Sequence, residues 1–395
     1  MNNKPFFSIA IPSKDRSELL HDLISSILDQ DFTDYQIVIA DNSVDKSSLK
    51  MVDSFCSNQI NYIKTEGLKM SENWNACINA SSGSYLVLMS DKTVLKKGAL
   101  RFLYEILKHK NKKCITWNLD QLVGGDVYIS EPTVEHSHDI KSDNLLRKML
   151  GSDWIGFDDS PMHSNSCISM DLVDKIKDRF GSLCMELNPD YTMATHILLS
   201  IEGIYRLNTN LTILQRPSLE SSHGNGSSFL KKTSLADGFM NDHISWRKNG
   251  YKNAEIPIDG DSFILNIMLK DVYAVLKLHK VDPDIYLDRE KRVVTYYHYT
   301  FKEILWRMSM GIEMKNEMKS WDDAFFRESF KVKIKVYKRN SSLYFYNLIS
   351  RIKFVVKNAD NIFLDKLLSN YRTVKYTNIG VRYKDINEML KDNNI

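Results

Sequence analysis

The chain contains few cysteines, and their arrangement argues against two kinds of site. The 395 residues include five cysteines without any C-x-x-C spacing, namely Cys56, Cys77, Cys114, Cys167 and Cys184. A disulfide framework needs an even, closely spaced set, and a structural zinc site needs paired cysteines. We therefore expect reduced thiols in a cytoplasmic protein.

Long hydrophobic runs are also lacking. The first apolar run, residues 6–11, ends at Pro12 and is too short for a signal peptide. No run approaches the roughly 18 apolar residues that a membrane-spanning helix requires. The sequence predicts a chain that is soluble or rests on a membrane surface.

A strong net charge is absent as well. The formal net charge is +3 at pH 7, which is too small to indicate a nucleic-acid partner by itself. Hydrophobic residues make up 43% of the chain and aromatic residues 11%, as in a globular protein. A chain of this length usually forms about two or three domains.

The N-terminal part contains alternating strand and helix patterns. The apolar stretches at 6–11, 35–40 and 85–89 are typical of buried strands. Residues 17–30 and 72–81 have helical patterns and lie between these stretches. This alternation predicts an α/β fold with a doubly wound, mostly parallel sheet.

Polar residues follow each of the three predicted strands. They are Pro12–Arg16, Asp41–Ser43 and Asp91–Thr93. Because the carboxyl ends of parallel strands meet at one edge of a sheet, we expect these segments to line a ligand-binding crevice.

Two longer stretches of sequence resemble family 2 glycosyltransferases of the GT-A fold. Residues 7–45 resemble that family's opening strand, loop, helix and second strand, and residues 75–91 resemble its approach to the metal motif. The resemblance extends to about residue 225. It implies a nucleotide-sugar-binding half at 1–120 and an acceptor-binding half at 121–228. The remainder, 229–395, has helical spacing at 262–280 and 300–314 and is expected to be mainly helical.

The resemblance implies that the first two strand ends hold the nucleotide. The residues carried over are Pro12, Ser13, Lys14, Arg16 and Asp41, with Asp41 accepting a hydrogen bond from the base. Lys14 and Arg16 are also suitable donors for a diphosphate on chemical grounds. The alternatives are a solvated turn at 13–16 and an Asx turn at Asp41.

The third strand end departs from the family pattern. The family carries D-x-D or D-D-x there, with one carboxylate on the ribose and another on Mn²⁺ or Mg²⁺, whereas this chain has Asp91-Lys92-Thr93. Asp91 alone makes a weak metal site, since a divalent ion usually takes one or two carboxylates together with phosphates. A divalent cofactor is therefore doubtful, and Lys92 is a candidate to replace part of the metal's charge on the diphosphate. The alternative is a solvated Lys92 beside a metal held by Asp91 and the substrate phosphates.

An inverting transfer also needs a base for the acceptor hydroxyl. In the family this base is the aspartate of an E-D motif that precedes an amphipathic helix. The segment "ELNPDYTMATHILLS" (186–200) matches, with Asp190 as the base and Pro189 in place of the glutamate. Asp190 could instead only cap that helix. Glu186, Asp158 and Asp159 are the fallback bases.

Two further segments are candidates for binding. His223 lies in "SSHGNGSS" (221–228), where family members often cover the donor with a loop; a spectator histidine is the alternative. Residues 331–357 contain eight Lys or Arg, no acidic residue and five aromatics. Such a segment can lie on the anionic inner face of a membrane, or it can be an edge strand and a helix with solvated charges.

Together these features predict an inverting glycosyltransferase, transferring a hexose or deoxyhexose. The donor would be a nucleotide diphosphate sugar, and the acceptor a glycan, such as a lipid-linked oligosaccharide of O-antigen or capsule synthesis. No nucleic-acid partner is expected. The alternative is a catalytically degenerate GT-A domain that serves as a nucleotide-binding or glycan-binding scaffold.

Overall fold

The computed structural model describes most of the chain. The described residues are 4–123, 125–130, 136–151, 159–185, 188–216, 256–258, 263–309, 313–340 and 376–382. The chain divides into two compact units, and each is described by itself. The first comprises residues 1–145, 158–221 and 374–395, and the second comprises 146–157 and 222–373. The expected boundary at residue 120 stays a prediction.

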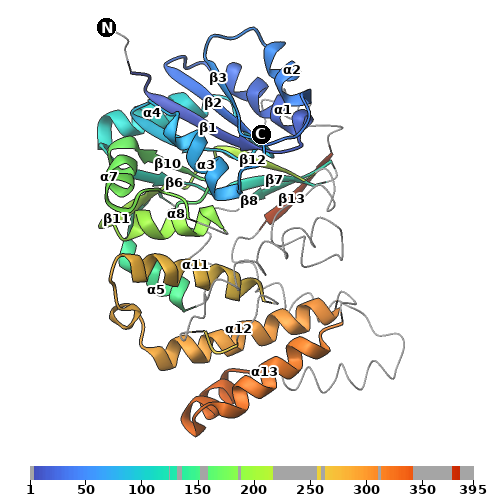
Figure 1. Cartoon of the computed structure of the whole chain (residues 1–395), viewed down its shortest axis with the longest axis vertical. Coiled ribbons are helices and arrows are strands. Elements are labelled where there is room, and N and C mark those ends of the chain that lie inside the picture. The colour runs from blue at the N-terminus through green and yellow to red at the C-terminus, as the bar shows by residue number, and fades with distance from the viewer. Residues whose placement is uncertain are drawn as a thin grey trace. The chain divides into compact units, whose positions relative to one another are not determined.

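The first unit is built on a mixed sheet of eight strands (Figure 1). In spatial order they are β3 (Ile60–Lys64), β2 (Tyr35–Asp41), β1 (Phe7–Ser13), β4 (Tyr85–Leu88), β10 (Ser166–Ser169), β6 (Cys114–Thr116), β11 (Gly203–Arg206) and β9 (His138–Lys141). The first four strands are parallel, as expected for a mostly parallel sheet, although β3 lies outside the three predicted strands. Strand β10 runs antiparallel to both of its neighbours. The α/β class is confirmed, and the sheet is mixed beyond β4.

The same unit carries a second sheet that the sequence patterns do not predict. Its order is β13 (Tyr376–Arg382), β8 (Asp126–Ser130), β7 (Leu119–Val123), β12 (Thr212–Arg216) and β5 (Thr93–Leu95). β5 begins two residues after Asp91 and pairs antiparallel with β12. The segment Asp91–Thr93 therefore connects the two sheets.

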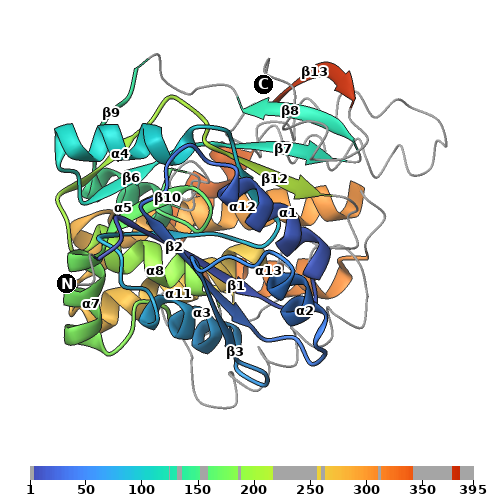
Figure 2. The same ribbon diagram turned by 90° about the horizontal axis from the view of Figure 1, so that it is seen from above.

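Helices surround the first sheet (Figure 2). They are α1 (Ser17–Leu28), α2 (Ser47–Asp53), α3 (Met70–Asn79), α4 (Ala99–Lys110), α7 (Met170–Phe180) and α8 (Pro189–Leu198). Helix α3 packs on β1 and β2, and α1 packs against β5. The apolar spacing in α1 explains its orientation, because Leu20, Leu23 and Ile27 are fully buried together with Ile9 of β1. Helix α5 (Ser142–Leu150) spans the boundary between the units.

The start of β4 is fixed closely against β1. The Gly83 N–H donates to Ser8 Oγ at 2.7 Å. A Cβ on Gly83 would lie 2.5 Å from Ser8 N, so no larger residue fits without movement of the backbone. The close approach holds β4 in register with β1, with Ala10 opposite Leu88. The strand end that carries Asp91 is thereby positioned beside the end of β1.

The second unit is helical in its described part. It contains α11 (Ile264–Leu278), a 3₁₀ turn (Pro283–Ile285), α12 (Arg289–Ser309) and α13 (Lys315–Arg327). Residues 330–340 are also helical. Trp321 of α13 packs against Tyr297 of α12 with ring centroids 5.3 Å apart. The predicted helical C-terminal region is confirmed here, whereas the alternative of an edge strand is wrong for residues 331–340.

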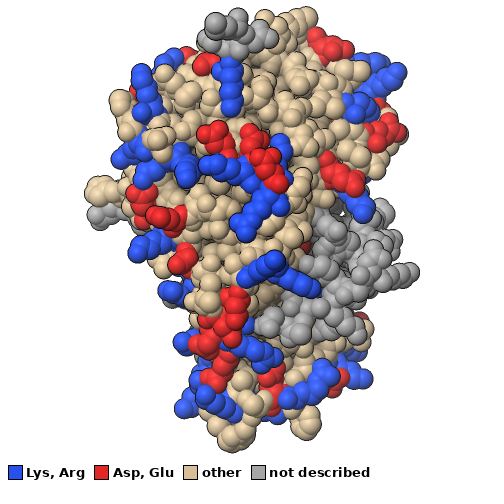
Figure 3. Space-filling view, turned by 60° about the vertical axis from the view of Figure 1, so that its left-hand side comes forward, with Lys and Arg blue, Asp and Glu red and all other residues tan. Residues whose placement is uncertain are grey.

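The surface and the helices give two further observations. Acidic and basic side chains are interspersed on the face in Figure 3, in keeping with the net charge of +3. Among the described helices, none combines the length and hydropathy of a membrane span.

Candidate functional site

The ends of β1 and β4 meet through a buried carboxylate. Asp91 is 1% exposed, and both of its oxygens are engaged. Ser13 Oγ donates to Asp91 Oδ2 at 2.8 Å, and Arg16 Nη1 donates to Asp91 Oδ1 at 2.8 Å. Three of the predicted donor-site residues are thus in direct contact. The short strand pairing between β1 and β4 causes this, because it brings both carboxyl ends to one edge.

The loop between β1 and α1 is held in a strained conformation. Asp15 has φ of 54°, a left-handed value that a non-glycine residue rarely adopts. Its N–H donates to Ser43 Oγ at 2.7 Å, which ties the loop to the end of β2. Lys14 is exposed and Arg16 is partly buried. Such strain persists where surrounding contacts enforce it, and it is common at ligand sites.

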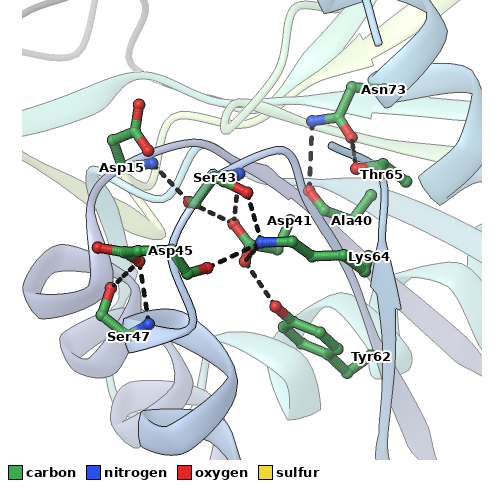
Figure 4. A network of polar contacts seen from close by, with 10 residues as sticks. All are labelled: Asp15, Ala40, Asp41, Ser43, Asp45, Ser47, Tyr62, Lys64, Thr65 and Asn73. Carbon is green, nitrogen blue, oxygen red and sulfur yellow. Dashed lines mark hydrogen bonds and ion pairs between the residues drawn. The ribbon is translucent and has the colours of Figure 1, made fainter. Parts of the chain in front are cut away.

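Asp41 at the end of β2 is the centre of a second network (Figure 4). Its Oδ1 accepts hydrogen bonds from the Ser43 N–H at 3.1 Å and from Ser43 Oγ at 2.5 Å. Its Oδ2 accepts from the Tyr62 hydroxyl at 2.5 Å and lies 3.4 Å from Lys64 Nζ. Asp41 is fully buried. The Asx-turn alternative is confirmed, and contact with a nucleotide base stays a prediction.

Lys64 and Tyr62 connect this network to β3. The register pairs Asp41 with Lys64, so the lysine side chain reaches back over the end of β2. Lys64 Nζ also donates to the carbonyls of Ser43 and Asp45. Burial and the hydrogen bond to Asp41 raise the pKa of the Tyr62 hydroxyl well above its ordinary value, so this tyrosine stays a donor.

A loop before β10 lies against the end of β4. The Ser90 N–H donates to Ser164 Oγ at 2.8 Å, and the Ser164 N–H donates to Leu88 O at 2.6 Å. Ser164 Oγ also lies 2.7 Å from Thr93 Oγ1. Ser164 has φ of 65°, the second strained position at this edge of the sheet. These bonds fix the neighbouring His163 close to the Asp91–Thr93 segment.

Asp190 reaches the same place from helix α8. Its Oδ2 lies 3.7 Å from His163 Nδ1, and the two side chains are 21% and 32% exposed, respectively. Asp190 lies in the first turn of α8, while Asn188 occupies the N-cap position. The Tyr191 N–H donates to Asp190 Oδ1 at 3.1 Å, and the helix dipole favours a carboxylate at this end.

The charges of His163 and Asp190 act on each other. Burial lowers the pKa of His163 and raises the pKa of Asp190. Each partner's charge opposes the effect of burial on the other, and His163 also experiences the charges of Lys92 and Asp91. The adjacent residues Asp91 and Lys92 and the distant Asp190 are therefore within electrostatic reach of one imidazole.

The other predicted residues have varied surroundings. Pro12 is buried at the end of β1, and Lys92 is half-buried with its carbonyl accepting from the Gln215 N–H. Asp159, a fallback base, is paired with the buried Arg206 at 3.3 Å. Three predicted residues lie outside the described residues: Asp158, Glu186 and His223.

The residues around Asp91 do not fit a resident divalent cation. Mn²⁺ or Mg²⁺ needs free oxygen ligands, yet the two carboxylate oxygens of Asp91 accept from Ser13 and Arg16. The guanidinium of Arg16 already places a positive charge on this carboxylate. Within the described part of the chain, no group of three or more His, Cys, Asp or Glu side chains could hold a metal ion.

Sequence patterns did not point to several of these residues. His163 lies in a turn-rich stretch whose spacing carries no catalytic motif, and its position beside Asp190 becomes visible only when α8 and β4 are placed. Tyr62 and Lys64 alternate on β3, but only the register with β2 shows that both face Asp41.

Comparisons with known proteins show which family and which proteins this chain is similar to. The family model of glycosyl transferase family 2 matches residues 8–149. The GalNAc(5)-diNAcBac-PP-undecaprenol beta-1,3-glucosyltransferase of Campylobacter jejuni is 28% identical over 105 residues, which are 26% of this chain and 34% of that protein. The match thus spans about a third of the length of this curated relative.

Solved structures of S. aureus TarS are also similar. TarS 1-349 has a TM-score of 0.43 at 16% identity, over 74% of this chain and 91% of that one. Its complex with UDP-GlcNAc has a TM-score of 0.45 at 16% identity, with the same coverage of both chains.

The fold and the site define an α/β protein with polar residues gathered at the carboxyl edge of parallel strands. The segment that matches the family model, residues 8–149, contains β1, β2 and β4 with the polar residues that follow them. Residues 8–149 are therefore similar to glycosyl transferase family 2.

Proposed function

We propose that the protein transfers a sugar from a nucleotide diphosphate donor to a glycan acceptor with inversion, and that Asp190 is the general base. The observation that carries the proposal is the meeting of Asp190 with the end of β4. His163 lies 3.7 Å from Asp190 and within electrostatic reach of Asp91 and Lys92. An acceptor hydroxyl and a donor diphosphate bound at this edge would be adjacent.

The side chains at this site suit each step of the proposed transfer. The acceptor hydroxyl attacks the anomeric carbon and gives its proton to the Asp190 carboxylate. The bond from that carbon to the diphosphate breaks, and the electron pair leaves with the diphosphate. A positioned general base contributes about 10²–10⁴-fold to such a rate. Burial raises the pKa of Asp190, which makes it a stronger base than an exposed aspartate.

The leaving diphosphate would be stabilised by side chains of the protein. Lys92 is half-buried beside Asp91, and Arg16 contacts Asp91 from the β1 loop. Fixed cations that face a developing negative charge lower the barrier as a metal ion does. We therefore include low metal dependence in the proposal, with Lys92 as the group that faces the diphosphate.

The acceptor is proposed to be a lipid-linked oligosaccharide, in surface polysaccharide synthesis of the O-antigen or capsule kind. The name of the Campylobacter relative specifies a glycan on PP-undecaprenol. That name supports a lipid-linked acceptor here. A hexose or deoxyhexose is the proposed sugar.

A basic helix supports action at a membrane surface. In residues 330–340 the side chains of Phe330, Ile334 and Tyr337 are 78%, 38% and 53% exposed, while Val332 and Val336 are buried. The helix carries Lys331, Lys333, Lys335, Lys338 and Arg339 without an acidic residue. Lys331 and Lys335 pair with Glu290. Exposed apolar residues among cations suit an anionic lipid surface.

Vesicle flotation tests the membrane contact. The wild type should bind vesicles of phosphatidylglycerol more than those of phosphatidylcholine, and Phe330→Ser should reduce the binding. Phe102→Ser, which changes a 40% exposed phenylalanine on α4, is the control. Equal binding by both variants, or binding of RNA in preference to lipid, would contradict this part.

The transfer itself is tested with the purified protein. Nucleoside diphosphates are screened by thermal shift, because a ligand that binds only the folded state raises the melting temperature. The sugar derivatives of the best nucleotide are then assayed for hydrolysis and for transfer to lipid-linked acceptors. Turnover with an inverted anomeric centre supports the proposal, and a retained centre contradicts it.

The missing second carboxylate favours one other function, a degenerate domain that binds nucleotide or glycan without turnover. The engagement of both oxygens of Asp91 by Ser13 and Arg16 is the observation in its favour. Tight nucleotide binding without any donor hydrolysis or transfer would support this scaffold function over catalysis.

A further inference from the structure

The proposed reaction does not yet give a role to His163, whose side chain lies at the site. Its Nδ1 atom is buried and has no hydrogen-bond partner among the described residues. Asp190 Oδ2 is 3.7 Å away, which is an ion-pair distance but too long for a hydrogen bond. A buried ring nitrogen in this position is costly unless it carries out a function or gains a partner.

The imidazole is held in place from two sides. Its ring packs edge-on against the Trp74 indole of α3, with centroids 5.2 Å apart. Along the chain it is followed by Ser164, whose hydrogen bonds to Ser90 and Leu88 and whose left-handed backbone fix the loop. Helix α3 is also tied to the segment before α8, because Asn75 Nδ2 donates to Cys184 O at 2.7 Å. The distance between His163 and Asp190 is thus fixed by three elements.

We propose that His163 is a positioning residue that pairs with Asp190 and relays the proton that this carboxylate takes from the acceptor hydroxyl. This inference rests on the proposed function. The proton passes from Asp190 Oδ2 to His163 Nδ1 as the carboxyl rotates or the gap closes, and the imidazole then returns it to solvent. Its side chain is 32% exposed, so exchange with water is open. No oxidant, metal or further reactant is required.

The groups around the pair determine its response to pH. His163 faces Asp190 on α8, Lys92 and Asp91 after β4, and the uncharged Trp74 on α3. Asp190 also faces the Cys184 thiol, whose pKa burial raises so far that it stays neutral. A protonated His163 favours the ionised form of Asp190, and Asp190 favours the protonated form of His163. Removal of either partner should therefore shift the titration of the other.

A first test needs no catalysis. The His163 imidazole is titrated by NMR, its signal being assigned by its loss in His163→Gln. In Asp190→Asn the pKa of His163 should fall, because the carboxylate that favours the imidazolium is gone. Asp22→Asn is the matched control, since it removes a carboxylate 3.6 Å from the more exposed His21 and should leave His163 unchanged. An unchanged pKa of His163 in Asp190→Asn overturns the pairing.

A second test follows kcat/KM against pH. The relay needs a neutral His163, so protonation of either partner contributes to the acidic limb of the wild type. In His163→Gln the limb should move to lower pH, because only Asp190 then titrates, and the rate at high pH should fall by less than the about 10²–10⁴-fold expected for loss of the base itself. His163→Lys supplies a charge but no proton acceptor and should not restore the rate. Full restoration by lysine, or a loss in His163→Gln that is equal at all pH values, would overturn the relay.

The two tests separate the inference from the proposed function. If the wild type transfers no sugar to any acceptor but the NMR titrations are linked, the pair exists and the relay is overturned with the proposed function. If transfer occurs and the titrations are independent, the function stands and the inference is wrong.

Discussion

Arg16 and Asp91 form an ion pair at 2.8 Å in which the carboxylate is almost fully buried. The side chain of Arg16 is 15% exposed and that of Asp91 is 1% exposed. The pair joins the loop after β1 to the end of β4. It places a positive charge directly on this carboxylate.

Loss of this pair should cost stability. In Arg16→Met the Asp91 carboxylate stays buried with only Ser13 as a strong donor, so the free energy of unfolding should fall by about 3 kcal/mol, as for a broken buried pair. Arg101→Met is the control, because Arg101 and Asp31 also lie 2.8 Å apart but are 49% and 53% exposed. An exposed pair of this kind contributes about 0–1 kcal/mol. Equal losses in urea unfolding would show that Arg16 and Asp91 do not act as a buried pair.

Asp41→Ala should destabilise the protein as well as weaken nucleotide binding. The substitution removes the acceptor of Ser43, Tyr62 and Lys64, and buried donors left without a partner cost about 1–3 kcal/mol. The exposed Asp45, whose carboxylate accepts from the Ser47 N–H and hydroxyl (Figure 4), provides the control variant Asp45→Ala.

Tyr62→Phe separates the two roles of Asp41. It frees one carboxylate oxygen and keeps the charge, so calorimetry should find the nucleoside diphosphate bound at least as well as by the wild type. Weaker binding by Tyr62→Phe, with normal binding by Asp41→Ala, would assign the contact to the tyrosine instead.

The sequence predicted the first half of the fold better than the second. The strands at 6–11, 35–40 and 85–89 and the helix at 17–30 are regular apolar patterns, and each is present in the structure. The second sheet was missed because its strands are short and pair across distant segments, such as Thr212 with Leu95. Periodicity within a segment carries no information on such long-range pairing.

The site was predictable where it follows strand ends. Ser13, Arg16 and Asp91 meet because parallel strands β1 and β4 end together, a consequence of topology that strand order alone implies. His163 could not be found in this way. Its position depends on a strained loop residue, Ser164, and on the packing of α3 and α8, which no local pattern encodes.

The helical unit should lose stability as the pH falls from 6.5 toward 4. Burial lowers the pKa of His298 from 6.5 to about 4, while its hydrogen bond to Asn340 raises it by less. Between these values the unfolded chain binds a proton that the folded chain does not, so the free energy of unfolding falls with decreasing pH. His298→Gln should show a smaller decrease of Tm between pH 7 and pH 4.5.

The matched control for this prediction is His109→Gln. His109 is 73% exposed on α4, so its replacement should leave the pH dependence of Tm as in the wild type. The comparison uses the slope of Tm with pH instead of Tm itself, since His298→Gln also changes packing. An identical slope in His298→Gln and the wild type would show that this histidine titrates normally in the folded state.

Asp190→Asn should lose most transfer activity and still bind the donor. The amide keeps the shape of the side chain and the contact with the Tyr191 N–H, but it cannot accept the proton of the acceptor. The expected loss in kcat is about 10²–10⁴-fold. Donor affinity from calorimetry should stay within a few-fold of the wild type, because Arg16, Asp91 and Lys92 are unchanged. Near-normal turnover would indicate that Glu186 or Asp158 is the general base instead, since Asp159 is paired with Arg206.

Activity should survive chelation of metal ions, and Lys92→Ala should reduce it. Each oxygen of Asp91 already accepts a hydrogen bond, and in the proposed function a cation held by the protein itself, on Lys92, stabilises the leaving diphosphate. Lysine is a compact point charge that can replace a metal's charge but not its multi-ligand geometry. The substitution should therefore lower kcat more than donor affinity.

Lys97→Ala, which changes a lysine just beyond β5, is the control for general charge loss. The measurement is the transfer rate in excess EDTA, with and without added Mn²⁺ or Mg²⁺, for the wild type and both variants. If EDTA abolishes wild-type activity, added metal restores it fully and Lys92→Ala has no effect, then Asp91 exchanges Arg16 for a metal ion when the donor binds, and the lysine is a bystander.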